Sequence, residues 1–154
     1  MGLDFGLYWK NINTEDEDVY DDEHELCYGR KSWELVNVLV PNFKKSEEDP
    51  LITKERWENL MRIIYPISDR LAAVSQAFDI VDNAPEDFPE MVVTNEVKRA
   101  IAEYELWYNR AFNCHPTLGY RFSVSYIKNF WDAKNKVNKY LDDPNYEVRA
   151  YVSY

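Results

Sequence analysis

The sequence predicts an α+β fold, with four or five helices packed on a small antiparallel sheet that the two ends of the chain form. Three observations lead to this prediction. Apolar residues alternate with polar ones at both termini, the segments between them repeat apolar residues at helical spacing, and 154 residues suffice for one domain. With 45% apolar and 16% aromatic residues, the chain has enough apolar area to fold. We therefore expect residues 1–154 to form a single domain.

The two ends of the chain carry the period-two alternation that is typical of half-buried strands. One alternating segment runs from Leu3 to Lys10, and the other runs from Tyr146 to Tyr154. A ribbon of two strands is only marginally stable in water. We therefore expect these strands to pair with each other or with a third strand around residues 26–28, and to rest on helices.

Helical spacing of apolar residues begins after the third predicted strand. The first helix is expected from about Trp33 and should stop before Pro41, because proline disfavours helical backbone at the residue before it. Thr53 is a suitable N-cap for a second helix, which Pro66 breaks or kinks. Apolar residues continue at spacings of three and four as far as Val81. This region is therefore either one kinked helix or two helices in series.

Two more amphipathic segments follow in the second half of the chain. Thr94 or Asn95 can cap a helix whose apolar positions run through residues 97–112. Ser123 or Ser125 can open a final helix, which ends at the Asp-Asp-Pro sequence some twenty residues later. The chain shows no internal repeat and no linker between domains.

Negative charge is concentrated in one short segment near the N-terminus. Of the net charge of −10, the first 25 residues contribute −8 and the other 129 contribute −2. We predict that residues 13–25 form an acidic insert or loop. Dense carboxylates repel nucleic acid and anionic membranes but attract basic protein grooves, although such a segment can also serve solubility alone. The candidate partner-binding residues are Glu15, Asp16, Glu17, Asp18, Asp21, Asp22, Glu23 and Glu25.

Two short elements of the sequence carry a resemblance to a known group of proteins. They are Met-Gly-Leu-Asp-Phe-Gly-Leu-Tyr at residues 1–8 and Glu-Leu-Cys-Tyr-Gly-Arg-Lys at residues 25–31. Together they resemble a family of small bacteriophage and prophage proteins, which open on a Met-Gly-Leu-Asp strand and continue with a Tyr-Trp-Arg-Lys element. Gly29 stands here where that family has Trp. The resemblance implies a phage setting, and the family has no assigned catalytic residues.

A phage setting suggests what the acidic segment does. Small acidic phage proteins often act against host defence by occupying the basic nucleic-acid channel of a restriction or CRISPR nuclease. Such a channel holds its duplex mainly through backbone charge, so closely spaced carboxylates can compete for the same basic side chains.

The sequence favours neither a metal site nor catalysis. His24, Cys27, Cys114 and His115 are the available zinc ligands, but the adjacent pair at positions 114 and 115 fits tetrahedral geometry poorly. The acidic run lacks the glycine of a calcium-binding EF-hand loop. A glycine-rich phosphate loop and a nucleophile elbow are both missing. We therefore predict no metal, no cofactor and no catalytic residues.

Composition also indicates the compartment and the partner. Two cysteines and an N-terminus unlike a signal peptide favour a reducing cytoplasm, and no apolar run approaches the roughly 20 residues that span a bilayer. The net charge disfavours direct binding of nucleic acid. We therefore expect a non-enzymatic phage protein that binds and inhibits a basic host protein, such as a CRISPR or restriction nuclease, by mimicking nucleic acid. The alternatives are a small metal-dependent enzyme and a structural or regulatory phage protein.

Overall fold

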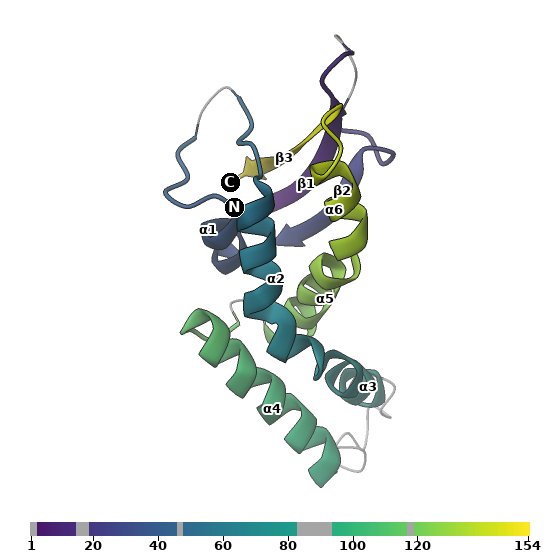
Figure 1. Ribbon diagram of the computed structural model, residues 1–154. Coiled ribbons are helices and arrows are strands. Elements are labelled where there is room, and N and C mark those ends of the chain that lie inside the picture. Colours follow the sequence, from purple (N-terminus) through teal and green to yellow (C-terminus); the bar gives the residue numbers. More distant parts are fainter. Residues whose placement is uncertain (1–2, 15–18, 46–47, 83–93, 117–118) are drawn as a thin grey trace. The chain divides into compact units, whose positions relative to one another are not determined.

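The computed structural model describes residues 3–14, 19–45, 48–82, 94–116 and 119–154, with only the backbone for residues 119–122 (Figure 1). The chain divides into two compact units. Unit 1 comprises residues 1–62 and 129–154, and unit 2 comprises residues 63–128. The described elements of the whole chain are, in order, β1 (Asp4–Asn11), β2 (Glu25–Arg30), α1 (Trp33–Leu39), α2 (Lys54–Ser68), α3 (Leu71–Asp82), α4 (Asn95–Phe112), α5 (Gly119–Asp132), α6 (Lys134–Leu141) and β3 (Tyr146–Ser153). The boundary between the units falls within α2 and within α5.

Unit 1 is built on a three-stranded sheet of order β2-β1-β3 (Figure 1). β1 is the central strand and pairs antiparallel with both neighbours. Its pairing with β3 runs without a break from Asp4 opposite Ser153 to Asn11 opposite Tyr146. The predicted α+β class, the pairing of the two chain ends and the third strand are therefore confirmed.

One face of the sheet carries the core of unit 1. Phe5 and Leu7 point to this face, whereas Tyr8, the next residue of β1, points to the opposite one. Phe5 stacks on Phe130 of α5 with ring centroids 5.2 Å apart, and Phe130 lies 6.3 Å from Trp57 of α2. β3 adds the buried side chains of Val148 and Ala150. Helix α1 adds Leu35, Val36 and Leu39.

Both outer edges of the sheet have hydrogen-bonding partners. At the β2 edge, the Tyr28 amide donates to Oδ1 of Asn129 at 2.8 Å. At the β3 edge, the Ala150 amide donates to the Pro50 carbonyl at 3.0 Å, and the Ile52 amide donates to the Val148 carbonyl at 2.8 Å. Unpaired backbone groups at a sheet edge can pair with other chains, and these hydrogen bonds reduce the number of such groups.

The region around Pro66 forms two helices in series, the second of the two predicted arrangements. The break falls at residues 69–70 and not at the proline, which lies inside α2. The last carbonyls of α2 find other donors there. The Arg70 side chain donates to the Pro66 carbonyl and the Arg70 amide donates to the Ile67 carbonyl, each at 2.9 Å. These bonds satisfy carbonyl groups at the end of α2 that lack the amide partners a continuous helix would provide.

The boundaries of the last helices differ in part from the prediction. Thr94 caps α4 as expected, because its hydroxyl accepts from the Val97 amide at 3.3 Å. Ser123 does not open α5, which begins four residues earlier. Its hydroxyl instead lies 2.5 Å from the Tyr104 hydroxyl in a buried contact within unit 2. The expected final helix is divided at Ala133, so the described residues hold six helices and not four or five.

Candidate functional site

The acidic segment leads directly into β2. Residues 15–18, which include four of the predicted binding residues (Glu15, Asp16, Glu17 and Asp18), lie outside the described residues. We call residues 19–25 the acidic turn. Within it, Asp21, Asp22 and Glu23 are exposed, whereas Glu25 is half-buried as the first residue of β2. Neither Asp22 nor Glu23 pairs with a basic side chain in the described part of the chain, so both carboxylates face solvent unneutralised.

His24 anchors the acidic turn to the sheet. The histidine is only 3% exposed, its Nδ1 lies 2.6 Å from Oδ1 of Asp21, and its ring lies 4.1 Å from the Trp9 ring. Trp9 Nε1 also donates to the Glu23 carbonyl at 3.3 Å. The hydrogen bond from His24 lowers the pKa of the Asp21 carboxyl. The exposed carboxylates therefore lie on a turn that His24 and Trp9 hold against the sheet.

A β-bulge sets the direction of the Glu25 side chain. Leu7 pairs with Cys27, but the next residue of β1, Tyr8, pairs with Glu25, so β2 holds one extra residue between them. A bulge of this kind redirects the side chains that follow it. Glu25 therefore lies opposite Tyr8, on the face of the sheet that does not carry the core.

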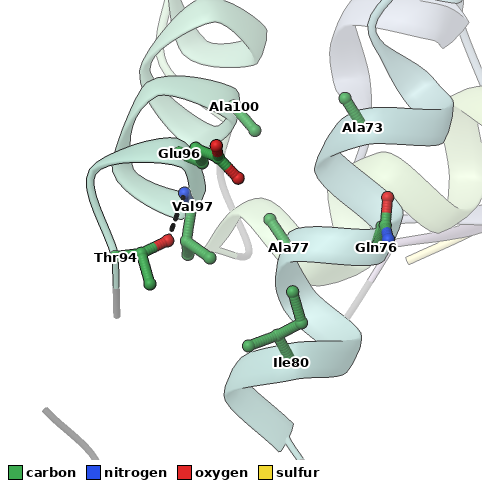
Figure 2. Close-up of a pocket in the computed structure, with 8 residues that line it drawn as sticks. All are labelled: Ala73, Gln76, Ala77, Ile80, Thr94, Glu96, Val97 and Ala100. Carbon is green, nitrogen blue, oxygen red and sulfur yellow. Dashed lines mark hydrogen bonds between the residues drawn. The ribbon is translucent and has the colours of Figure 1, made fainter. Parts of the chain in front are cut away.

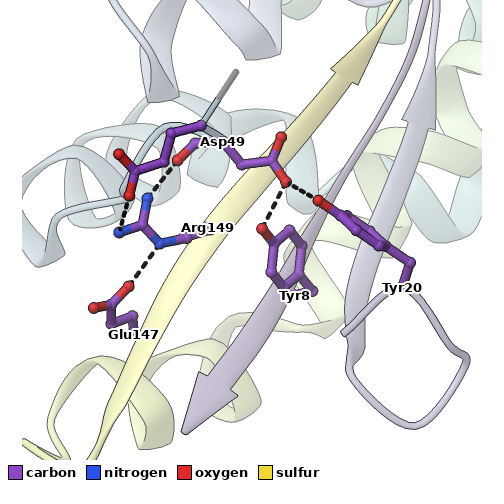
Figure 3. Close-up of polar contacts among 6 residues, drawn as sticks. Tyr8, Tyr20, Asp49, Glu147 and Arg149 are labelled. Carbon is purple, nitrogen blue, oxygen red and sulfur yellow. Dashed lines mark hydrogen bonds and ion pairs between the residues drawn. The ribbon is translucent and has the colours of Figure 1, made fainter. Parts of the chain in front are cut away.

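Two tyrosine hydroxyls converge on one carboxylate at this second face (Figure 3). Tyr8 Oη donates to Oδ2 of Asp49 at 2.6 Å, and Tyr20 Oη donates to the same oxygen at 2.8 Å. The two rings lie edge to face with centroids 5.4 Å apart. Burial and the hydrogen bond to Asp49 raise the pKa of Tyr8, and the separate hydrogen bond that Tyr20 donates to Asp49 raises the pKa of Tyr20. Both hydroxyls therefore stay protonated as donors at neutral pH.

Arg149 on β3 holds the segment that carries Asp49. Its Nη1 donates to the Asp49 carbonyl, its Nη2 lies 3.3 Å from Oε1 of Glu48, and its Nε lies 2.6 Å from Oε2 of Glu147 (Figure 3). The arginine side chain is largely buried in this network. Three acceptors on one guanidinium group thus fix Asp49 in place beside the two tyrosines.

A pocket opens between the acidic turn, Tyr8 of β1 and Tyr151 of β3. It has a volume of about 220 Å³ and is lined by Tyr8, Val19, Tyr20, Asp21, Glu25 and Tyr151. We call it the tyrosine pocket. The sequence indicated the acidic residues but not the tyrosines or Asp49. Tyr8 and Asp49 are 41 residues apart, and no local pattern connects them.

The four zinc ligands considered from the sequence are distributed over both units. His24 and Cys27 belong to unit 1, and Cys27 is buried within β2, where burial raises its thiol pKa. Cys114 and His115 belong to unit 2, where His115 lies 3.1 Å from Glu105. A different group of possible ligand atoms, from Asp21, Glu23 and His24, lies within 4.8 Å of one another.

Unit 2 has hollows of its own. One of about 220 Å³ lies between α3 and α4, and small side chains including Ala73, Ala77 and Ala100 line it (Figure 2). A second, of about 270 Å³, is lined by Trp107 and Arg110, whose guanidinium group lies 4.8 Å from the indole ring. Among the residues of unit 2 that the structure describes, these hollows bring no set of catalytic groups together.

The comparisons with known proteins give no relative for this chain: no family model, curated protein or solved structure matches it. Of the described helices, none combines the length and the apolar character needed to cross a bilayer.

Proposed function

We propose that this protein is a phage-encoded inhibitor that binds a basic host protein, most directly a defence nuclease whose nucleic-acid channel accepts the acidic turn. The observation that carries the proposal is the uncompensated charge of that turn. Asp22 and Glu23 are exposed and have no basic partner in the described part of unit 1. When unpaired carboxylates bind lysines and arginines of a partner, no ion pair within this protein has to be broken first, so binding carries no free-energy cost from that source.

The charge of the surrounding unit supports the same proposal. Unit 1 holds 19 acidic and 12 basic residues, a net charge of −7, whereas unit 2 contributes −3. Negative potential of this kind raises the rate at which a basic surface is encountered. The contacts of His24 add a second factor, because an anchored turn loses less conformational freedom on binding than a free one.

Capture from a lysate of a defence-competent bacterium, with two matched variants, tests the proposal. One variant removes four charges in and beside the acidic turn: Glu17→Gln, Asp18→Asn, Asp22→Asn and Glu23→Gln. The control removes four charges from exposed helix positions elsewhere: Glu55→Gln, Glu58→Gln, Glu96→Gln and Glu103→Gln. Both variants carry a net charge of −6, so they differ in where the charge lies and not in its total.

We expect the parent and the control to retain a basic nucleic-acid-binding protein that salt elutes, and the acidic-turn variant to retain much less of it. Inhibition of the captured nuclease by the parent would then establish the activity. Equal capture by the two variants would show that the position of the charge is irrelevant, and mimicry by the turn would be wrong.

A small metal-dependent enzyme is the second candidate, and the grouping of Asp21, Glu23 and His24 is the observation that favours it. Elemental analysis of protein purified without chelator separates the two candidates. We expect no stoichiometric metal, because Nδ1 of His24 already bonds to Asp21 and its ring is covered by Trp9. One equivalent of metal that is lost on His24→Gln would favour the enzyme instead.

A further inference from the structure

The tyrosine pocket combines aromatic rings with carboxylates. Three of its six lining residues are tyrosines, from β1, the acidic turn and β3, and two are acids, Asp21 and Glu25. None of the six is basic. Aromatic faces attract cations through the ring quadrupole, and carboxylates add charge and hydrogen-bond acceptors. The chemistry of the lining is therefore that of a site for an organic cation.

Glu25 is the residue of the pocket that most needs a partner. The residue as a whole is half-buried, and its carboxylate forms no hydrogen bond or ion pair with any residue in the described part of the chain. Lys136 acts on it only at longer range, and burial together with Asp22 raises its pKa. A partly desolvated carboxylate without a direct partner is costly, and a cation that entered the pocket would relieve that cost.

The walls of the pocket are held in place before any ligand arrives. The Tyr8 and Tyr20 hydroxyls are fixed by Asp49, which Arg149 holds in turn. The Tyr151 ring lies directly over Gly6, where a Cβ atom would come within 2.7 Å of it. A glycine at this position therefore lets the ring lie flat against the sheet. Preorganised walls of this kind reduce the entropy lost on binding.

We propose that the tyrosine pocket receives the side chain of an arginine from the basic partner. This inference rests on the proposed function and names the contact at its centre. Arginine fits better than lysine because its planar guanidinium group stacks on aromatic rings, offers five donors to carboxylates and is less strongly hydrated than an ammonium group. The faces of the aromatic rings and the Glu25 carboxylate then bind different parts of one side chain.

Short capped peptides test the pocket without the partner. The probes are acetyl-Gly-Arg-Gly-amide, the same peptide with lysine, and the same peptide with citrulline, which keeps the shape of arginine without its charge. Each is titrated into the isotopically labelled full chain, and NMR follows the resonances of the six lining residues. We expect the arginine peptide to shift these resonances saturably, the lysine peptide to bind more weakly, and the citrulline peptide to have no effect.

Two variants and one control assign the binding to the pocket. We expect Glu25→Gln to weaken the arginine peptide about tenfold, because a charge-assisted hydrogen bond is lost. We expect Tyr20→Ala to weaken it about threefold, because one ring of the pocket is lost. Glu55→Gln removes the same charge from the exposed surface of α2 and should leave affinity within twofold of the parent. Tyr20 is 68% exposed, so its replacement should leave the fold intact.

The results distinguish failure of the pocket proposal from failure of the proposed inhibitor function. Resonances of the pocket that do not move with the arginine peptide, or affinities unchanged in folded Glu25→Gln and Tyr20→Ala, would overturn the pocket proposal. Tighter binding of the lysine peptide would overturn the assignment to arginine. Capture of a basic partner despite a silent pocket would leave the inhibitor proposal standing alone. Binding of the arginine peptide without any captured partner would support the pocket as an arginine site and would count against the inhibitor proposal.

Discussion

At the level of single residues, the shared carboxylate of Asp49 makes the tyrosine face sensitive to high pH. Tyr8 is almost fully buried and donates to Asp49, and its pKa is raised from the ordinary value of about 10. A group with a raised folded-state pKa contributes stability that is present below its unfolded pKa and is lost as pH rises beyond it. The stabilising effect of the Tyr8 hydroxyl should therefore be full at neutral pH and should decline above pH 10.

Tyr8→Phe tests this effect. At pH 7 the variant should lose about 0.5–1.5 kcal/mol of unfolding free energy, the usual net value of one hydrogen bond. Above pH 10 the parent should lose stability more steeply than the variant, by at most about 1.4 kcal/mol per pH unit for this group. Denaturant titrations at several pH values measure both. Stability curves that remain parallel from pH 7 to 11 would contradict the role of the hydroxyl.

Gly29 lies where the core approaches the backbone of β2 closely. A Cβ atom there would lie 2.9 Å from Phe5 and 3.4 Å from Phe130, and these two rings are stacked and fully buried. Neither ring has room to withdraw. A larger side chain at position 29 therefore does not fit in this arrangement.

Gly29→Ala should consequently destabilise the protein by about 1–3 kcal/mol, the usual cost of overpacking a core. Chemical denaturation measures the loss. The matched control is Phe5→Leu with Gly29→Ala in the same chain, because the smaller side chain makes room for the added methyl group. The double variant should lose less than the sum of the two single changes. Strict additivity would show that the two residues do not compete for space.

At the level of elements, β3 stabilises unit 1 through pairing on both of its edges. It pairs with β1 along its whole length, accepts the segment 50–52 on its other edge and buries Val148 and Ala150. Removing residues 146–154 should therefore expose an apolar face and lower the melting temperature strongly or prevent folding. Removing Tyr154 alone, which lies beyond the strand, is the control and should have a small effect. A truncated chain that melts within a degree or two of the parent would contradict the paired ends.

The same elements indicate what the sequence alone can predict. The alternation in β1 and β3 and the cap at Thr94 are local signals, and all three are confirmed. The division at Ala133 and the buried contact of Ser123 with Tyr104 are not local, because packing between distant segments decides them. The candidate site divides in the same way. The acids form a run in the sequence, whereas Asp49 reaches the tyrosines only through the fold.

At the level of the whole molecule, the two compact units share two helices. α2 and α5 each contain the boundary between the units, so the backbone hydrogen bonds of both helices run across it. We therefore expect one cooperative unfolding transition, as a single domain requires. Hydrogen exchange at increasing denaturant, followed for β1 in unit 1 and α4 in unit 2, measures this directly. Loss of protection in α4 well before β1 would mean that the units unfold separately.

The distribution of charge is also a property of the whole molecule, and binding to a basic partner depends on it. Attraction between opposite charges speeds association at low salt and weakens as salt screens it. The acidic-turn variant and its helix control have equal net charge, so any difference between them reports on the position of the charge. Recognition of a basic partner by the acidic turn requires such a difference.

The most direct measurement is the rate of association with the captured nuclease as a function of salt, for the parent and these two variants. We predict that the acidic-turn variant associates about tenfold more slowly at low salt and with a shallower dependence on salt. The helix control should keep a rate and a dependence close to those of the parent. Equal rates and equal salt dependence for the two folded variants would contradict recognition by the acidic turn.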